Sequence, residues 1–90
     1  MDFDKIFAQN EECPVRSIGE GLVIMAPSGD TTHSLEDLGA FIWKQLDGKK
    51  TLQQVLETIL DDYDIDQDTA RQDLTDFITQ MLDAGLILDS

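Results

Sequence analysis

The sequence has little of what enzymes and metalloproteins commonly use for chemistry. Its 90 residues include one cysteine, Cys13, and one histidine, His33. A single cysteine excludes an internal disulfide and a thiolate-rich metal site within one chain. Neither residue lies in a recognisable nucleophile motif, and the sequence has no glycine-rich phosphate loop. We therefore expect a protein that is not an enzyme and that has no cofactor.

Positive charge is also scarce. Six Lys and Arg residues stand against 19 Asp and Glu residues, which gives a formal net charge of −13. Nucleic acid and anionic membrane surfaces would both repel such a chain, whereas a basic partner would be attracted. The longest apolar run, residues 22–26, is far shorter than the roughly 20 residues that span a bilayer. Since a signal-peptide pattern is also missing, we expect a cytoplasmic protein without a nucleic-acid or membrane partner.

The length favours a single domain, which we place at residues 13–90. In the preceding segment, residues 1–12, the spacing of Phe3, Ile6 and Phe7 predicts one amphipathic turn. This partly ordered segment would dock on the domain or on a second copy, although a frayed terminus explains the same residues equally well. A monomer and a homodimer are both compatible with this interpretation.

Short apolar and β-branched stretches predict a sheet of three strands. We expect them at residues 14–18, 21–26 and 31–33, with turns that contain glycine between them. The polar stretch Thr31-Thr32-His33 suits a strand at an exposed sheet edge. It has neither Pro nor Lys to block pairing with another chain.

From residue 34 the apolar spacing becomes helical. Ser34 is expected to cap the first helix, and Gly48 to end it. A capping-box signature that begins at Thr51 predicts the second helix. The third helix is expected to begin within residues 66–68 and to stop at Gly85.

Together these elements predict an α+β fold, in which a three-stranded antiparallel sheet is followed by a three-helix bundle in a winged-helix-like arrangement. Residues 86–88 would form a strand-like tail that packs under the helices. Some winged helices read DNA, but here the third helix carries several acidic side chains and only one cation, Arg71. Such a helix would repel the DNA groove.

Alternating acidic residues from Asp62 to Asp68, followed by Asp73, partly match a calcium-binding loop. However, Gln67 stands where that loop requires glycine, and Asp73 replaces its bidentate glutamate. An acidic turn that caps the third helix explains the same residues. We expect no metal site and retain calcium binding as the weaker alternative.

These exclusions leave binding as the predicted role. An extended peptide would add to the exposed strand through main-chain hydrogen bonds. The apolar stripe of the third helix is wide enough to serve both the core and a groove. Phe77 and Leu82 are expected in the core, whereas Leu74, Ile78 and Met81 fit either place.

Several short motifs follow one another in a family-specific order and spacing. They are Ile42-Trp43, Leu46-Asp47-Gly48, Tyr63-Asp64 and Gly85-Leu86-Ile87. Through them, the chain resembles the PqqD family over residues 15–88. Members of this family are peptide chaperones, also called recognition elements, in the maturation of ribosomally synthesised and post-translationally modified peptides (RiPPs).

The resemblance implies a three-stranded sheet with three helices that binds the leader of a precursor peptide. It also implies that the leader is presented to a maturase, often a radical S-adenosylmethionine enzyme. The leader would pair with the third strand and lie against the third helix. The corresponding residues here are Thr31, Thr32 and His33 through their backbone, and Arg71, Leu74, Thr75 and Ile78 on the helix. Arg71 would then pair with an acidic leader residue.

Two departures from the family pattern favour a pathway other than pyrroloquinoline quinone (PQQ) biosynthesis. The third strand lacks the aromatic residue that the family often has, and Glu36 stands where the family commonly has Asn. The alternative to leader recognition is a winged-helix-like protein–protein adaptor or regulatory module that does not bind DNA.

Overall fold

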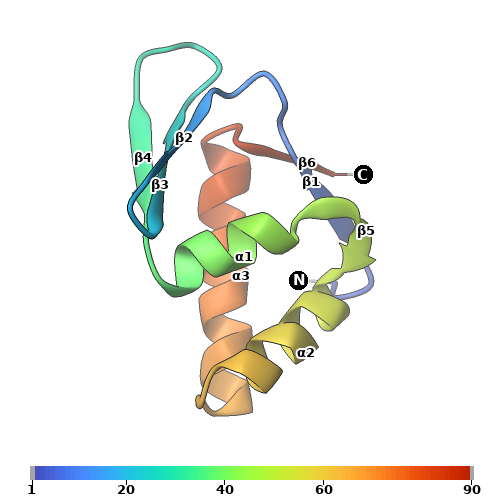
Figure 1. The fold of residues 1–90 in the computed structure, drawn as a ribbon. Coiled ribbons are helices and arrows are strands. Elements are labelled where there is room, and N and C mark those ends of the chain that lie inside the picture. Colours follow the sequence, from blue (N-terminus) through green and yellow to red (C-terminus); the bar gives the residue numbers. More distant parts are fainter. Residues whose placement is uncertain (1, 90) are drawn as a thin grey trace.

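The computed structural model describes residues 2–89, which form six strands and three helices. The strands are β1 (Ile6–Gln9), β2 (Val15–Ile18), β3 (Gly21–Met25), β4 (Thr32–Leu35), β5 (Asp47–Thr51) and β6 (Ile87–Asp89). The helices are α1 (Leu38–Gln45), α2 (Leu52–Asp62) and α3 (Gln67–Asp83). Two antiparallel sheets have the orders β2-β3-β4 and β5-β1-β6. In Figure 1 the first sheet lies at the upper left and the second at the right, while α1 crosses in front of α3.

The β2-β3-β4 sheet confirms the predicted three-stranded antiparallel sheet, and with the helices it confirms the α+β class. Leu22 pairs with Leu35, and Ile24 pairs with His33. Directly paired residues point to the same face of a sheet. The buried Leu22, Ile24 and Leu35 therefore identify the inner face, which packs on the helices. The intervening residues, among them Val23, point to the outer face.

The first helix begins later than the sequence predicted. Ser34 and Leu35 continue β4, and α1 begins only after Asp37. Ser34 is therefore not its cap. Asp37 precedes the helix with a φ of 50° and makes no side-chain capping bond. Leu35 fits the helical spacing, but its pairing with Leu22 holds it in the sheet.

The second sheet was not predicted, so the expected order of three strands followed by three helices is wrong. Residues 6–9 form strand β1 between β5 and β6, and not the amphipathic turn expected there. Gly48 was predicted to end the first helix, but it lies within β5 with a φ of 78°. The tail at residues 86–88 is confirmed as strand-like, since it overlaps β6. The division of the chain at residue 13 stays a prediction.

The starts of the other two helices are confirmed. The Thr51 hydroxyl accepts a hydrogen bond from the Gln54 N–H at 3.2 Å, and the Gln54 side chain accepts one from the Thr51 N–H at 2.9 Å. This capping box begins α2. Asp66 caps α3 by accepting the N–H of Thr69 at 3.0 Å. Among residues 2–89, no helix is both long and apolar enough to cross a membrane.

Both sheets and all three helices contribute to one core. Phe7 of β1 is only 3% exposed and belongs to the same buried cluster as Trp43 of α1. The side chains with the least exposure include Ile24, Ile42, Leu46, Leu52, Leu56, Ile59, Leu74, Ile78, Leu86 and Ile87. The N-terminal strand is therefore a structural part of the fold.

A Phe7→Ala substitution should lower the free energy of unfolding by about 3–5 kcal/mol, because it leaves a cavity under β1. Urea denaturation would measure the loss. Glu11→Ala, an exposed position in the same segment, should change stability by less than about 0.5 kcal/mol. Equal stability of wild type and Phe7→Ala would mean that β1 does not pack on the domain.

Candidate functional site

Strand β4 is an edge strand. It pairs with β3 on one side, and no strand among residues 2–89 pairs with its other side. Two backbone hydrogen bonds show that alternate main-chain groups of β3 and the residue after it bond toward β4 and toward β2. The Ala26 N–H donates to the Thr31 carbonyl at 2.9 Å, toward β4. The Met25 N–H donates in the opposite direction, to the Pro14 carbonyl at 2.9 Å.

This alternation determines which main-chain groups of β4 are free. In an antiparallel pair, every second residue bonds to the same neighbour. Because residue 31 bonds toward β3, His33 and Leu35 do so as well. The N–H and C=O groups of Thr32 and Ser34 therefore point to the open edge. An extended peptide would find its main-chain partners there.

The three strand residues predicted from the sequence differ in their exposure and in the direction of their main-chain groups. Thr32 is exposed and directs its main chain outward. Thr31 immediately precedes β4 and bonds to Ala26. His33 is half-buried, pairs with Ile24 and lies on the inner face. Ser34 was missed because the sequence placed it at the start of a helix.

A groove of about 250 Å³ lies between α1 and α3. It begins where β4 ends, at a junction formed by Leu35, Gly39 and Phe77. A Cβ added to Gly39 would lie 3.6 Å from the Phe77 ring and 3.7 Å from the Leu35 side chain. The groove is lined by Leu38, Gly39 and Ile42 of α1 and by Asp73, Asp76, Phe77 and Gln80 of α3.

The groove has an apolar floor and an acidic rim. Phe77, which was expected in the core, is only partly buried and lines the groove together with Leu38. Asp73 and Asp76 are exposed on the adjoining surface of α3. One Asp76 carboxylate oxygen accepts a hydrogen bond from the neutral side chain of Gln72 at 2.9 Å. The arrangement suits a ligand with an apolar side chain for the floor and polar or cationic groups for the rim.

The four residues of α3 that the sequence predicted to contact the leader do not form one surface in the structure. Leu74 and Ile78 are 0% exposed, which places both in the core. Arg71 is exposed, and its guanidinium carbon lies 4.2 Å from the centre of the Phe3 ring. Neither Arg71 nor Thr75 lines the groove. The helical repeat places these two residues on the opposite flank of α3.

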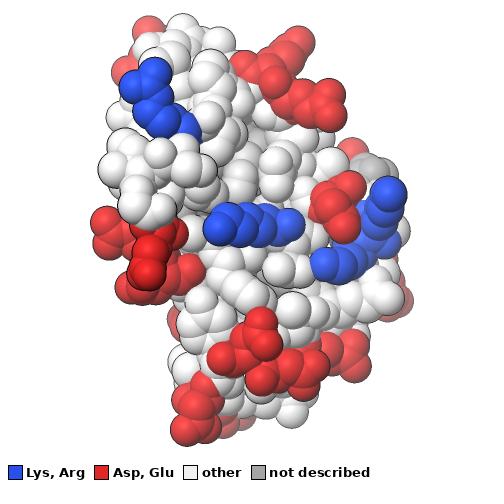
Figure 2. Space-filling view, viewed as in Figure 1, with Lys and Arg blue, Asp and Glu red and all other residues white. Residues whose placement is uncertain are grey.

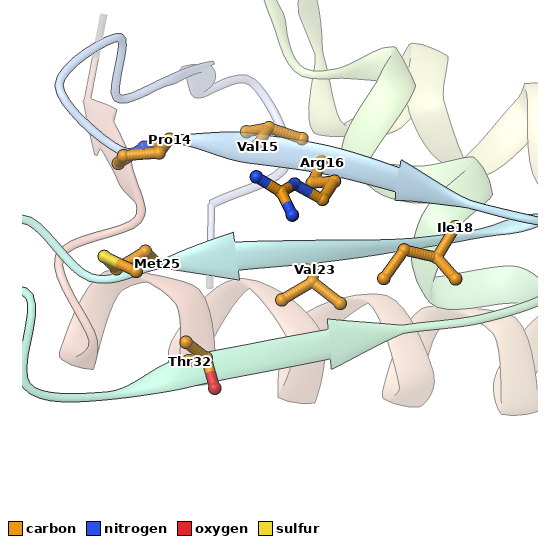
Figure 3. A pocket seen from close by; sticks show the side chains of 7 residues that line it. All are labelled: Pro14, Val15, Arg16, Ile18, Val23, Met25 and Thr32. Carbon is orange, nitrogen blue, oxygen red and sulfur yellow. The ribbon is translucent and has the colours of Figure 1, made fainter.

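A second apolar surface covers the outer face of the first sheet. Figure 3 shows the side chains that line a shallow hollow there, of about 360 Å³. Ile18 is 59% exposed and Met25 is also exposed, whereas the exposed Val15 pairs with Ile24 and so lies on the side of the inner face. Arg16 is the one cation among the residues that line this hollow. The hollow has a larger volume than the groove, but none of the residues that line it belongs to a helix.

Comparison with known proteins connects this fold to a family. The family model described as coenzyme PQQ synthesis protein D (PqqD) matches residues 21–87. The chain belongs to the PqqD family. The match begins at β3 and ends in β6, and so contains β4 and both helices of the groove. A search of curated proteins found no match.

Solved structures share the fold of this PqqD family member. One is described as TbiB1 in complex with the TbiA(beta) leader peptide, with 22% sequence identity and a TM-score of 0.79 over 89% of this chain and 93% of that chain. Another is lasso peptide synthetase B1 complexed with the leader peptide, with 21% identity and a TM-score of 0.79 over 91% and 96% of the two chains. The predicted resemblance to the PqqD family is thus confirmed.

The only cysteine of this family member is poorly suited to nucleophilic chemistry. Cys13 is 4% exposed, and its sulfur lies 3.7 Å from the Gly85 carbonyl oxygen. Burial raises the pKa of the Cys13 thiol, and the neighbouring Glu12 carboxylate raises it further. A thiol of this kind stays protonated at neutral pH and reacts slowly.

The acidic turn before α3 contains a helix cap. Within residues 2–89, no three His, Cys, Asp or Glu side chains lie close enough to hold a metal ion. One carboxylate oxygen of Asp66 accepts the N–H of Thr69 at 3.0 Å and its hydroxyl at 2.9 Å. These hydrogen bonds to the ionised form lower the pKa of Asp66.

An Asp66→Ala variant should therefore be less stable than wild type at neutral pH. Because folding lowers the pKa of Asp66, its stabilising effect is complete above the unfolded pKa and is lost as pH falls through the folded pKa. Urea denaturation over a pH series should show the difference from wild type closing in acid.

The exposed neighbour Asp64 provides a control, since it does not cap α3 and Asp64→Ala should produce a smaller loss of stability. If calcium raised the stability of wild type but not of Asp64→Ala, the turn would be a metal site in addition to a cap.

Proposed function

We propose that this protein binds the leader segment of a ribosomally made precursor peptide as an additional strand on β4. The observation that carries the proposal is the outward main chain of Thr32 and Ser34 beside the groove between α1 and α3. Two structural neighbours are complexes with leader peptides, which supports a ligand of the same class. The role agrees with membership in the PqqD family.

The geometry favours β4 over the other edge of the same sheet. Strand β2 is also an edge strand, but all four of its residues are exposed and no helix-lined groove adjoins it. A strand added to β4 would send alternate side chains to the inner face, where the Leu35–Phe77 junction opens into the groove. Main-chain bonds would provide affinity, and the groove would provide selectivity.

The ligand contacts we propose differ from those the sequence implied. Thr32 remains at the centre of the site, and Ser34 joins it. On α3 the contact surface moves from Leu74 and Ile78, which are buried, to Phe77 and its exposed neighbours. Arg71 and Thr75 lie outside this surface, and Arg71 is instead assigned to holding Phe3.

We further propose that the protein has no catalytic activity and delivers the bound leader to a separate maturase, a radical S-adenosylmethionine enzyme or another modifying enzyme. The buried, protonated Cys13 supports this role. A dissociation constant of about micromolar order is expected from several main-chain bonds and one apolar anchor. The net charge of −13 argues against a nucleic-acid partner, and we propose a cytoplasmic location.

A second candidate function is a winged-helix-like protein–protein adaptor that uses the outer face of the first sheet. The observation in its favour is the pair of exposed side chains Ile18 and Met25 on the same face as Arg16. Ile18→Lys distinguishes the two functions. Leader recognition predicts unchanged leader affinity in fluorescence anisotropy, whereas an adaptor would lose its protein partner in a pull-down and would bind no leader.

Proline substitutions test the proposed strand pairing. Thr32→Pro and Ser34→Pro each remove an outward N–H of β4 without removing a bond to β3, so the fold should persist. Leader affinity should fall by roughly tenfold or more with each variant, because each loses a main-chain bond and distorts the edge. Isothermal titration calorimetry with a leader peptide encoded near the gene would measure the change.

Ser17→Pro is the matched control, because Ser17 has the same outward orientation on β2, at the opposite edge. It should leave leader affinity unchanged. If Ser17→Pro abolished binding while Thr32→Pro and Ser34→Pro did not, the leader would pair with β2, and the proposed site would be wrong.

A further inference from the structure

We infer that the groove selects leader peptides that carry Lys or Arg beside the apolar residue that enters it. This inference rests on the proposed function and adds the chemistry of the ligand. It reverses the sign of the charge that the sequence implied, since Arg71 was expected to pair with an acidic leader residue.

Two groups of carboxylates lie near the end of β4 from which the groove begins. Asp73 and Asp76 line the groove on α3. Glu20, Glu36 and Asp37 line a neighbouring depression at the turn between β2 and β3 and the connection from β4 to α1. Figure 2 shows acidic side chains gathered at the left, where Figure 1 places the connection from β4 to α1. A peptide that runs along β4 and into the groove would therefore meet negative charge where it passes from the strand to the groove.

No cation among residues 2–89 forms an ion pair with these carboxylates. The one ion pair among the described residues joins Lys5 and Asp89, at 2.9 Å, and involves none of the carboxylates around β4. Asp73 and Asp76 are three residues apart on one helix, a spacing at which like charges repel each other. A ligand cation between them would relieve this repulsion, whereas a ligand carboxylate would increase it.

The two arginines of the protein lie elsewhere. Arg71 stacks on Phe3 and does not line the groove. Arg16 belongs to the hollow on the outer face of the sheet. An acidic leader residue in the groove would thus find no guanidinium there and would lie against Asp73 and Asp76.

The apolar floor fixes where the cation belongs on the ligand. Leu38, Ile42 and Phe77 line the floor and suit an aliphatic or aromatic anchor. On an extended peptide, every second side chain points to the same face. We therefore expect Lys or Arg two residues before or after the anchor, so that both side chains point to the groove. The aliphatic stem of the Lys or Arg would lie on the floor, and its charge would lie at the acidic rim.

A peptide selection tests this inference without knowledge of the natural leader. A displayed library of short random peptides would be selected on wild type and on the double variant Asp73→Asn/Asp76→Asn. Wild type should enrich peptides in which Lys or Arg stands two residues from an apolar residue. The double variant should lose this preference. Glu11→Gln/Glu12→Gln removes the same number of charges from the loop after β1, so it controls for net charge and should keep the preference.

Affinities of one enriched peptide and its Lys→Gln version would then be measured by fluorescence anisotropy. Wild type should bind the Lys form between about twofold and about 30-fold more tightly, as expected for one or two exposed ion pairs. The ratio should fall toward one in Asp73→Asn/Asp76→Asn and at high salt, because surface ion pairs are screened. Glu11→Gln/Glu12→Gln should retain the wild-type ratio.

Amide hydrogen exchange distinguishes a failure of the charge inference from a failure of the proposed leader binding. If enriched peptides protect β4 but show no cationic preference, or the same preference in Asp73→Asn/Asp76→Asn as in wild type, the charge inference is overturned and leader binding stands. If no peptide is enriched, or the enriched peptides leave β4 unprotected, both the inference and the proposed function are overturned.

Discussion

Strand β1 holds together the ends of the two helices that form the groove. The side chain of its last residue, Gln9, donates a hydrogen bond to the Trp43 carbonyl near the end of α1 at 2.9 Å. The next residue, Asn10, donates to the Gly85 carbonyl just after α3, also at 2.9 Å. β5 follows α1, β6 follows α3, and both strands pair with β1. The separation of the two groove walls therefore depends on a segment that precedes the sequence match to the PqqD family.

The other end of the groove is fixed by the register of the first sheet. Pairing of Leu35 with Leu22 turns Leu35 inward at the end of β4. Gly39 lies between the two side chains, where a Cβ would meet Phe77 and Leu35 at ordinary van der Waals distances of 3.6 and 3.7 Å. The same register leaves the main chains of Thr32 and Ser34 unpaired at the edge. The strand that would receive a peptide and the groove that would select it thus meet at one junction.

Sequence patterns predicted the elements that depend on local interactions. The caps at Thr51 and Asp66 involve residues within one helical turn. The capping box at Thr51 was predicted, and for the third helix the sequence predicted an acidic capping turn without singling out Asp66. The sheet β5-β1-β6 joins residues that are far apart in the chain, and its polar strand β5 has no apolar alternation to reveal it. Leu35 fits the spacing of a strand and of a helix, so only its pairing with Leu22 decides between them.

The site was harder to predict than the family for a physical reason. The motifs that carry the resemblance are largely structural: Ile42, Trp43 and Leu46 are buried, and the Asp47 carboxylate bonds to the N–H groups of Lys49 and Lys50. They identify the fold, and of the residues just named only Ile42 also lines the groove. On α3, the periodicity that places Leu74 and Ile78 in the core places Phe77 on the same stripe. Only the packing of α1 beside it leaves Phe77 at the groove.

The central claim is that a leader peptide pairs with the outward main chain of β4. Residue-resolved amide hydrogen exchange, with and without a bound leader, tests it most directly. The Thr32 and Ser34 amides should exchange rapidly in the free protein and become protected in the complex, while His33 and Leu35 are protected in both because they bond to β3. Protection that appears at Val15 and Ser17 of β2 instead, or a complex in which Thr32 and Ser34 still exchange rapidly, would contradict the account.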